Sequence, residues 1–169
     1  MVRQFSAGGV VYKLIDGKAK FLIRQNSTSA GYYSGGEWSL PKGWLDDALD
    51  GINPGPLTLG IKRATEQEMK TAALREVAEE GGVEAEIVNR LGDVKFFFTD
   101  HNHNKVFKIV VFYLMRYLRN LPEGFGPETS SVMWVNCDKA KEMLKKLKGE
   151  AGLIAKAEKL IYSGQQSLI

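Results

Sequence analysis

Hydrophobic residues near the N-terminus gather in two short runs that favour β-strands. The runs cover residues 5–13 and 21–25, and Asp16 and Gly17 stand between them. An Asp-Gly pair between strand-forming runs is a strong signal for a hairpin turn, so we expect an antiparallel hairpin here. Gly8 and Gly9 in the first run have two interpretations. They either let a ligand or a helix approach the strand closely or weaken an edge strand.

The second half of the chain carries further apolar runs of both strand and helix type. Residues 84–98 and 106–117 are apolar and aromatic and predict two strands, and residues 132–135 predict a last one. Residues 137–162 have apolar positions at helical spacing and predict two amphipathic helices that close the domain.

Between these regions, the spacing of polar and apolar residues predicts one well-delimited helix. Thr65 and Glu68 form a capping box at its start, and Gly81-Gly82 provides a left-handed stop. Leu74, Val77 and neighbouring Ala78 have the i, i+3, i+4 spacing that anchors a helix on a core.

Two segments lack an apolar period and predict loops. Residues 26–37 are rich in Ser, Gly and Tyr. Residues 46–63 hold several Asp, Gly and Pro residues, and a loop of this length is unusual in a compact domain. We expect the second loop to be either a substrate lid or a tolerated surface insertion.

Composition is typical of one globular domain covering residues 1–169. The chain has 44% hydrophobic and 25% charged residues, a net charge of +3 and a single cysteine. These values predict no disulfide, no cysteine-based metal site and no nucleic-acid partner, while the positive charge suits an anionic substrate. The sequence shows no signal peptide or membrane span, so we expect a cytoplasmic protein without a membrane partner. The oligomeric state is not readable from the sequence.

The predicted helix carries three acids within five residues near its C-terminal end. Glu76 and Glu80 project on one side, with Glu79 one step round the helix. Like charges at this spacing repel, and the helix dipole adds to their cost at this end. A solvated acidic face is one interpretation. The other, which we prefer, is a Mg²⁺ or Mn²⁺ site, because no lysine ladder neutralises the acids.

At these residues the chain resembles the Nudix hydrolase family. Residues 75–83, Arg-Glu-Val-Ala-Glu-Glu-Gly-Gly-Val, match the second half of the Nudix box, G-x5-E-x7-R-E-U-x-E-E-x-G-U, where U is aliphatic. Pro41-Lys42-Gly43 resembles the loop before the box, particularly in the diadenosine polyphosphate hydrolase branch. The first half departs from the pattern: counted from Gly43 the first Glu falls at Leu49, and counted from Arg75 it falls at Gln67, a difference of 18 positions. We expect Gln67 to brace Arg75 less strongly than a glutamate would.

The resemblance implies an α/β fold, a Nudix-type α/β/α sandwich with a mixed β-sheet. The box helix would cover one side and the C-terminal helices the other. It also implies metal-dependent hydrolysis of a nucleoside diphosphate linked to another group. Glu76, Glu79 and Glu80 would hold the metal with the Gly43 carbonyl, and one carboxylate would take a proton from water.

Further residues are candidates for contacting the substrate or the water. The resemblance implies that Arg75 orients the glutamates, that Lys42 and Arg24 bind phosphate, and that Glu128 serves as base or last ligand. Near the predicted turn at 100–104, Lys95 could receive distal phosphates, as could Lys105 and Lys108. Phe97 lies in the aromatic run where the diadenosine branch stacks adenine.

The sequence is compatible with three functions. Hydrolysis of a diadenosine polyphosphate is the first. Hydrolysis of damaged or ordinary nucleoside triphosphates is the second, and a Nudix-fold module that binds a nucleotide or a partner with little turnover is the third.

Overall fold

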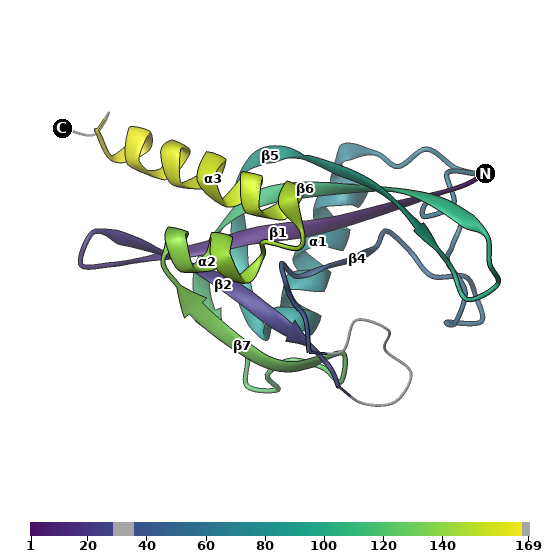
Figure 1. Ribbon diagram of the computed structural model, residues 1–169, viewed down its shortest axis with the longest axis horizontal. Helices are drawn as coiled ribbons and strands as arrows, with labels where there is room; N and C mark the ends of the chain where they lie inside the picture. The colour runs from purple at the N-terminus through teal and green to yellow at the C-terminus, as the bar shows by residue number, and fades with distance from the viewer. Residues whose placement is uncertain (29–35, 167–169) are drawn as a thin grey trace.

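The predicted mixed sheet between helices is present in the computed structural model, which describes residues 1–28 and 36–166 (Figure 1). Part of the loop expected at 26–37 therefore lies outside the described residues. The elements in chain order are β1 (Val2–Ile15), β2 (Lys18–Asn26), β3 (Trp38–Ser39), β4 (Lys42–Trp44), α1 (Glu66–Gly81), β5 (Val83–Thr99), β6 (Lys105–Asn120), β7 (Thr129–Val135), α2 (Cys137–Met143) and α3 (Lys148–Gln166).

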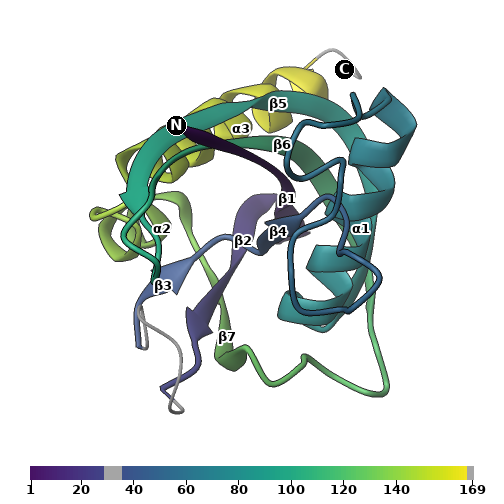
Figure 2. The same ribbon diagram turned by 90° about the vertical axis from the view of Figure 1, so that its right-hand side faces the viewer.

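The sheet is mixed because its central pair is parallel and its other pairs are antiparallel. The strand order is β3-β2-β1-β6-β5, with β1 parallel to β6, while β4 pairs with β1 and β7 with β2. The C-terminal half of β1 pairs with β2, whereas its middle pairs with β4 at Ser6, Ala7 and Gly8. This switch of partners lets β4 pair with β1 while it also contacts α1 (Figure 2).

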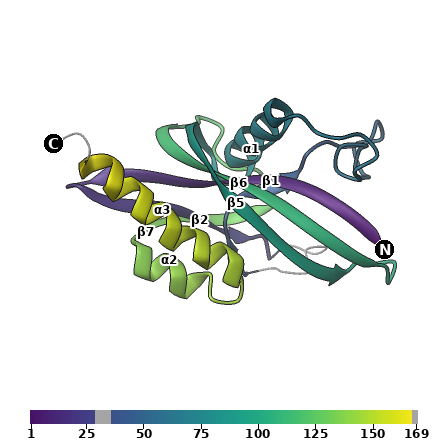
Figure 3. The same ribbon diagram turned by 90° about the horizontal axis from the view of Figure 1, so that it is seen from above.

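Alternation along the strands divides the core into two layers. Val11, Tyr113 and Met115 pack with α1 on one face, and Val10, Phe112 and Leu114 pack with α2 and α3 on the other. Figure 3 shows α1 and the pair α2–α3 on opposite sides of the strands. The α/β/α arrangement predicted from the Nudix resemblance is confirmed.

The two N-terminal glycines serve close packing in a central strand. A Cβ on Gly9 would lie 2.6 Å from Val77 Cγ2 of α1, and one on Gly8 would lie 2.4 Å from the Pro41 carbonyl oxygen. The interpretation of a weakened edge strand is therefore wrong. These glycines set the distances at which α1 and β4 approach β1.

Local signals placed α1 and the hairpin correctly. The Thr65 side chain accepts from Glu68 N while the Glu68 side chain accepts from Thr65 N, and Gly82 ends the helix with φ 69°. Asp16 and Gly17 both have positive φ at the β1–β2 turn, as a two-residue hairpin loop with right-handed strand twist requires.

The segment 46–63 is irregular, as predicted, and is closed on itself. The Asp46 carboxylate accepts hydrogen bonds from Leu57 N and Thr58 N, and Thr58 Oγ1 donates to the Asp46 carbonyl. The Thr58 carbonyl also accepts from Phe5 N, which ties the segment to the start of β1. These contacts make it an ordered extension of β4.

Within the described ranges, no helix is both long and apolar enough to span a membrane.

Candidate functional site

The side of α1 that faces β4 carries two buried carboxylates. Glu76 is 9% exposed and Glu80 is 4% exposed, whereas Glu79 is exposed on the adjacent face. The interpretation as a solvated acidic face is therefore wrong for Glu76 and Glu80. Their i, i+4 spacing puts both acids on one side, and the apolar contacts of Val77 fix that side against the sheet.

Glu76 lies directly against the backbone of Gly43. A Cβ on Gly43 would come within 2.2 Å of the Glu76 carboxyl carbon, so only glycine leaves room for the carboxylate. This contact brings the backbone at Gly43 and the acid of α1, which are 33 positions apart in sequence, to the same point. A backbone carbonyl and a carboxylate are both ligands that hard cations prefer.

Arg75 links α1 to β4 and holds Glu76 from one side. Its guanidinium Nη2 lies 2.6 Å from the Trp44 carbonyl oxygen and 3.2 Å from Glu76 Oε1. The expected brace from Gln67 is wrong: the Gln67 side chain is exposed and hydrogen-bonds Thr71 Oγ1, one helical turn further on. The carbonyl of Trp44 takes the bracing position instead.

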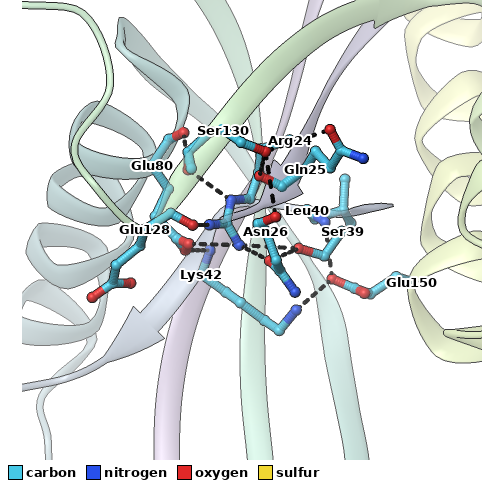
Figure 4. Close-up of polar contacts among 11 residues, drawn as sticks. Arg24, Gln25, Asn26, Ser39, Leu40, Lys42, Glu80, Glu128, Ser130 and Glu150 are labelled. Carbon is cyan, nitrogen blue, oxygen red and sulfur yellow. Dashed lines mark hydrogen bonds and ion pairs between the residues drawn. The ribbon is translucent and has the colours of Figure 1, made fainter. Parts of the chain in front are cut away.

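Glu80 is held by β2 and β4. Its Oε2 forms an ion pair of 3.0 Å with Arg24 Nη1, and its Oε1 accepts a hydrogen bond of 2.9 Å from Lys42 N (Figure 4). Each oxygen of the Glu80 carboxylate is therefore held by a different strand.

Arg24 was expected to bind phosphate, but the structure places it inside a protein network. It is 5% exposed, and its Nε donates to Thr129 Oγ1 at 2.9 Å while its Nη2 donates to the Glu128 carbonyl at 2.5 Å. Its Nη1 also donates to Asn26 Oδ1 and, at 3.4 Å, to Ser39 Oγ. With its donors engaged in this way, Arg24 positions Glu80 and the loop before β7.

Burial changes the proton affinity of both acids. It raises the pKa of Glu76 to about 7, and repulsion from Glu80 adds to the effect, while Arg75 opposes it. Burial also raises the pKa of Glu80 to about 7, against the opposing effect of Arg24. Two desolvated carboxylates that repel each other are stabilised as anions by a nearby cation.

The donor set therefore fits a divalent metal that takes oxygen ligands. Glu76, Glu80 and the Gly43 carbonyl could supply protein ligands, and exposed Glu79 lies one position before Glu80. Within residues 1–28 and 36–166, no three acidic, histidine or cysteine side chains converge on a single point. Mg²⁺ commonly binds one or two carboxylates and completes its shell with water and substrate phosphate, so Glu76 and Glu80 would suffice as its acidic ligands.

A cleft of about 800 Å³ lies beside Glu80, which is part of its lining. Its polar part includes Arg24, Lys42, Glu80, Lys108 and Glu128, and its apolar part includes Val94, Phe96, Val110, Phe112 and Leu147. This volume is within the range of small-molecule sites, which combine apolar walls with a few polar groups. The lining, as far as the chain is described, includes no residue of 46–63, so the lid interpretation of that segment gains no support.

The candidates on β5 divide between the cleft and another surface. Lys95 lines the cleft as proposed, together with Lys108 of β6. Phe97 instead packs on Phe107, with ring centroids 4.8 Å apart, and Lys105 lies over the Phe97 ring. Phe97 was predicted to stack on adenine, but it does not line the cleft. The neighbouring residue, Phe96, lines it instead.

Glu128 stands where the cleft meets a second cavity of about 370 Å³. Its carbonyl is held by Arg24, and its exposed side chain lies close enough to Glu80 to raise the pKa of that carboxyl slightly. This position agrees with a role as base or additional ligand.

Glu150 of α3 lines the cleft, although no pattern in the sequence indicated this residue. Its Oε1 lies 3.0 Å from Lys42 Nζ. In sequence it belongs to an amphipathic helix whose charged residues are most simply solvated.

The exposed position of Gln67 leads to a prediction. We expect Gln67→Glu to change kcat/KM by less than about twofold, since surface substitutions without buried partners have small effects. Steady-state kinetics beside the wild-type protein would check this. A loss of tenfold or more would show that Gln67 reaches the site during turnover.

Comparisons with known proteins bear on the family and the fold. The NUDIX domain family matches residues 6–156. The MutT4 protein of Mycobacterium tuberculosis (strain CDC 1551 / Oshkosh) is 30% identical over 134 residues, which are 79% of this chain and 46% of that protein. The chain thus spans less than half the length of this relative.

Solved structures show the same fold at low identity. A Caenorhabditis elegans Ap4A hydrolase in a binary complex has a TM-score of 0.59 and 19% identity, covering 96% of this chain and 99% of that one. The NUDIX domain of Shewanella oneidensis NrtR complexed with ADP ribose has a TM-score of 0.58 and 16% identity, covering 95% and 90%. The family match over most of the chain, the acids of α1 and the shared fold lead to one conclusion: this chain belongs to the Nudix family.

Proposed function

We propose that the protein hydrolyses a pyrophosphate linkage in a nucleoside diphosphate joined to a second group, with Mg²⁺ or Mn²⁺ as cofactor. The observation that carries the proposal is the pair of buried acids on α1. Glu76 lies against Gly43, and Glu80 accepts from Lys42 N and lines a cleft that also carries cations. A pyrophosphate repels an attacking hydroxide, so its cleavage needs positive charge around the phosphate oxygens and a positioned water.

Different residues would bind the metal, position its ligands and accept the proton of water. Glu76, Glu80 and the Gly43 carbonyl would hold the metal, and Glu79, exposed on the adjacent face of α1, would join them only if its side chain turned toward the site. When bound, the metal would neutralise phosphate charge and acidify a water molecule. Arg75 and Arg24 position Glu76 and Glu80, respectively. One carboxylate of the site would accept the proton of the attacking water, and Glu128, which lines the cleft beside Glu80, is a further candidate for this step.

The cations of the cleft would bind the phosphate chain. Lys42, Lys95 and Lys108 all line it. They come from β4, β5 and β6, so a chain of several phosphates could contact more than one of them. This arrangement supports a diadenosine polyphosphate as the leading substrate.

A nucleoside triphosphate, damaged or ordinary, is the second candidate. The relation to MutT4, named for a mutator protein, favours this class. The same acids and cations would serve it, because the bond to be cleaved is again a phosphoric anhydride. A module that only binds nucleotides is less well supported, because both buried acids and Gly43 are retained.

Product analysis tests the proposal. The protein with Mg²⁺ is incubated with diadenosine tetra- and hexaphosphate, ATP, an oxidised deoxyguanosine triphosphate and ADP-ribose, and the products are separated by chromatography. Reactions with chelator, and with Glu76→Gln, are the controls. Absence of metal-dependent hydrolysis from the whole panel would contradict the proposed activity.

The lowered pKa of Lys108 leads us to expect that kcat/KM depends on pH. Burial and the nearby Lys42 lower its pKa to about 8, so the side chain is a cation below this pH and is neutral above it. We expect kcat/KM to fall severalfold as pH rises from 7 to 9, since kcat/KM reports groups of the free enzyme. In Lys108→Arg the cation persists and this fall should be smaller.

Lys105→Arg is the matched control, because Lys105 lies over Phe97 on β5. It should retain the wild-type pH profile. An unchanged profile in Lys108→Arg would exclude Lys108 as the titrating group.

A further inference from the structure

Glu150 is a buried acid in the lining of the cleft, separate from the acids proposed to bind the metal. It is 2% exposed and belongs to the first turn of α3. The preceding Gly149 allows this placement, since a Cβ there would lie 2.7 Å from Val94 Cγ1 of β5. Close packing of α3 on β5 thus inserts the Glu150 carboxylate into the cleft wall.

The two oxygens of this carboxylate have different surroundings. Oε1 accepts hydrogen bonds from Lys42 Nζ at 3.0 Å and from Leu40 N at 3.2 Å (Figure 4). Oε2 is buried and has no hydrogen-bond partner within the described part of the chain. An unpartnered buried oxygen of an acid is costly, and such groups in native proteins require an explanation.

A purely structural role explains only one of the oxygens. A negative group near the N-terminus of α3 is favoured by the helix dipole, and Oε1 joins α3 to the chain between β3 and β4. Neither effect needs Oε2. A carboxylate can only accept hydrogen bonds, so this oxygen is suited to a ligand that brings a donor.

The neighbouring lining indicates the kind of ligand. Val94, Phe96, Phe112 and Leu147 give the cleft apolar and aromatic surfaces, and Lys42, which also lines it, lies 3.0 Å from Glu150. A flat ring with N–H groups at its edge could occupy the apolar part while its phosphates extend toward Lys42. Nucleobases have this combination of an apolar face and polar edges.

We propose that Glu150 is a specificity-determining residue that accepts a hydrogen bond at Oε2 from an N–H group of the substrate's nucleobase. The assignment rests on the proposed function for the class of ligand. It selects bases that present a donor to this point and disfavours those that present an acceptor or a bare C–H. Glu150 also positions Lys42 through Oε1. The same side chain would therefore contact the base and hold the lysine that contacts phosphate.

Binding of nucleoside monophosphates tests the assignment without requiring turnover. Calorimetry would compare AMP with purine riboside monophosphate, which lacks the amino group, and GMP with inosine monophosphate, which lacks the 2-amino group. The proteins are the wild type, Glu150→Gln and Glu142→Gln. The last is a control for loss of charge at an exposed site on α2.

We expect the wild type and Glu142→Gln to prefer the amino-bearing member of at least one pair by about tenfold, the usual effect of a hydrogen bond to a charged group. Glu150→Gln should keep its fold and lose this preference, because the amide retains an acceptor for Leu40 N and can turn a donor toward the base. A uniform loss of affinity within both pairs would indicate a structural role and overturn the assignment.

The assignment would also be overturned if the wild type bound both members of each pair with equal affinity, since recognition would then not depend on the amino group of the base. Absence of binding of all four nucleotides at millimolar concentrations would overturn it as well. Failure of the proposed function is seen separately. If the protein shows the Glu150-dependent preference but cleaves no pyrophosphate, the assignment of Glu150 stands and the proposed hydrolysis is wrong.

Discussion

Glu76→Gln should lower kcat/KM for pyrophosphate hydrolysis by at least about 100-fold while leaving the fold intact. Loss of groups that merely support metal ligands costs about 10- to 100-fold, so loss of a charged ligand should cost no less. Glutamine keeps the size of the side chain against Gly43, and Arg75 keeps its bond to the Trp44 carbonyl. Steady-state kinetics at saturating Mg²⁺ measure the effect. Near-normal turnover would exclude Glu76 from the metal site.

The same variant should resist heat better than the wild type at alkaline pH without metal. The folded-state pKa of Glu76, about 7, lies above the value of 4.5 for a free glutamate. The folded state therefore binds more protons than the unfolded state between these values, and wild-type stability falls as pH rises through this window. Glutamine does not titrate, so its advantage in Tm should be larger at pH 8 than at pH 4.

Glu80→Gln is expected to be equally inactive but less informative about stability. It removes the anionic partner of buried Arg24, 3.0 Å away, and leaves a charge without compensation. Breaking a buried ion pair from one side is strongly destabilising, by about 3–5 kcal/mol. Relief of repulsion with Glu76 is smaller than this cost. Scanning calorimetry of both variants would separate the two effects.

Gly43→Ala should reduce kcat/KM by about 100-fold, even though the substitution adds one methyl group. The added Cβ would stand 2.2 Å from the Glu76 carboxyl carbon, well inside van der Waals contact, so the carboxylate must move away from the Gly43 backbone. A displacement of about 1 Å at a catalytic group is enough for such a loss. Titration with Mn²⁺ should also show weakened metal binding.

Gly152→Ala is the matched control, because nothing lies within 4 Å of a Cβ built at this position of α3. Alanine is favoured over glycine in a helix interior, so this variant should be fully active and slightly more stable. Wild-type activity in Gly43→Ala would mean that the close contact with Glu76 does not matter for catalysis.

Features that depend on neighbouring residues were determined by the sequence itself. The capping box at Thr65, the left-handed stop at Gly82 and the Asp16-Gly17 turn all involve hydrogen bonds or φ values confined to a few residues. The shared orientation of Glu76 and Glu80 follows from helical geometry alone. The fold was expected from the resemblance of residues 75–83 to the Nudix box. Spacing within one helix is fixed wherever that helix packs.

Contacts between distant segments were decided only by the tertiary structure. Arg24 pairs with Glu80 because β2 lies beside β7 and the end of α1, which leaves its donors engaged within the protein. Trp44 replaces Gln67 as the partner of Arg75 because β4 packs on α1. Strand register and twist place Phe96 in the cleft and Phe97 over Phe107. Glu150 reaches Lys42 from 108 positions away through the packing of α3 on β5. Such pairings depend on which surfaces meet when the whole core is buried, and no local pattern encodes them.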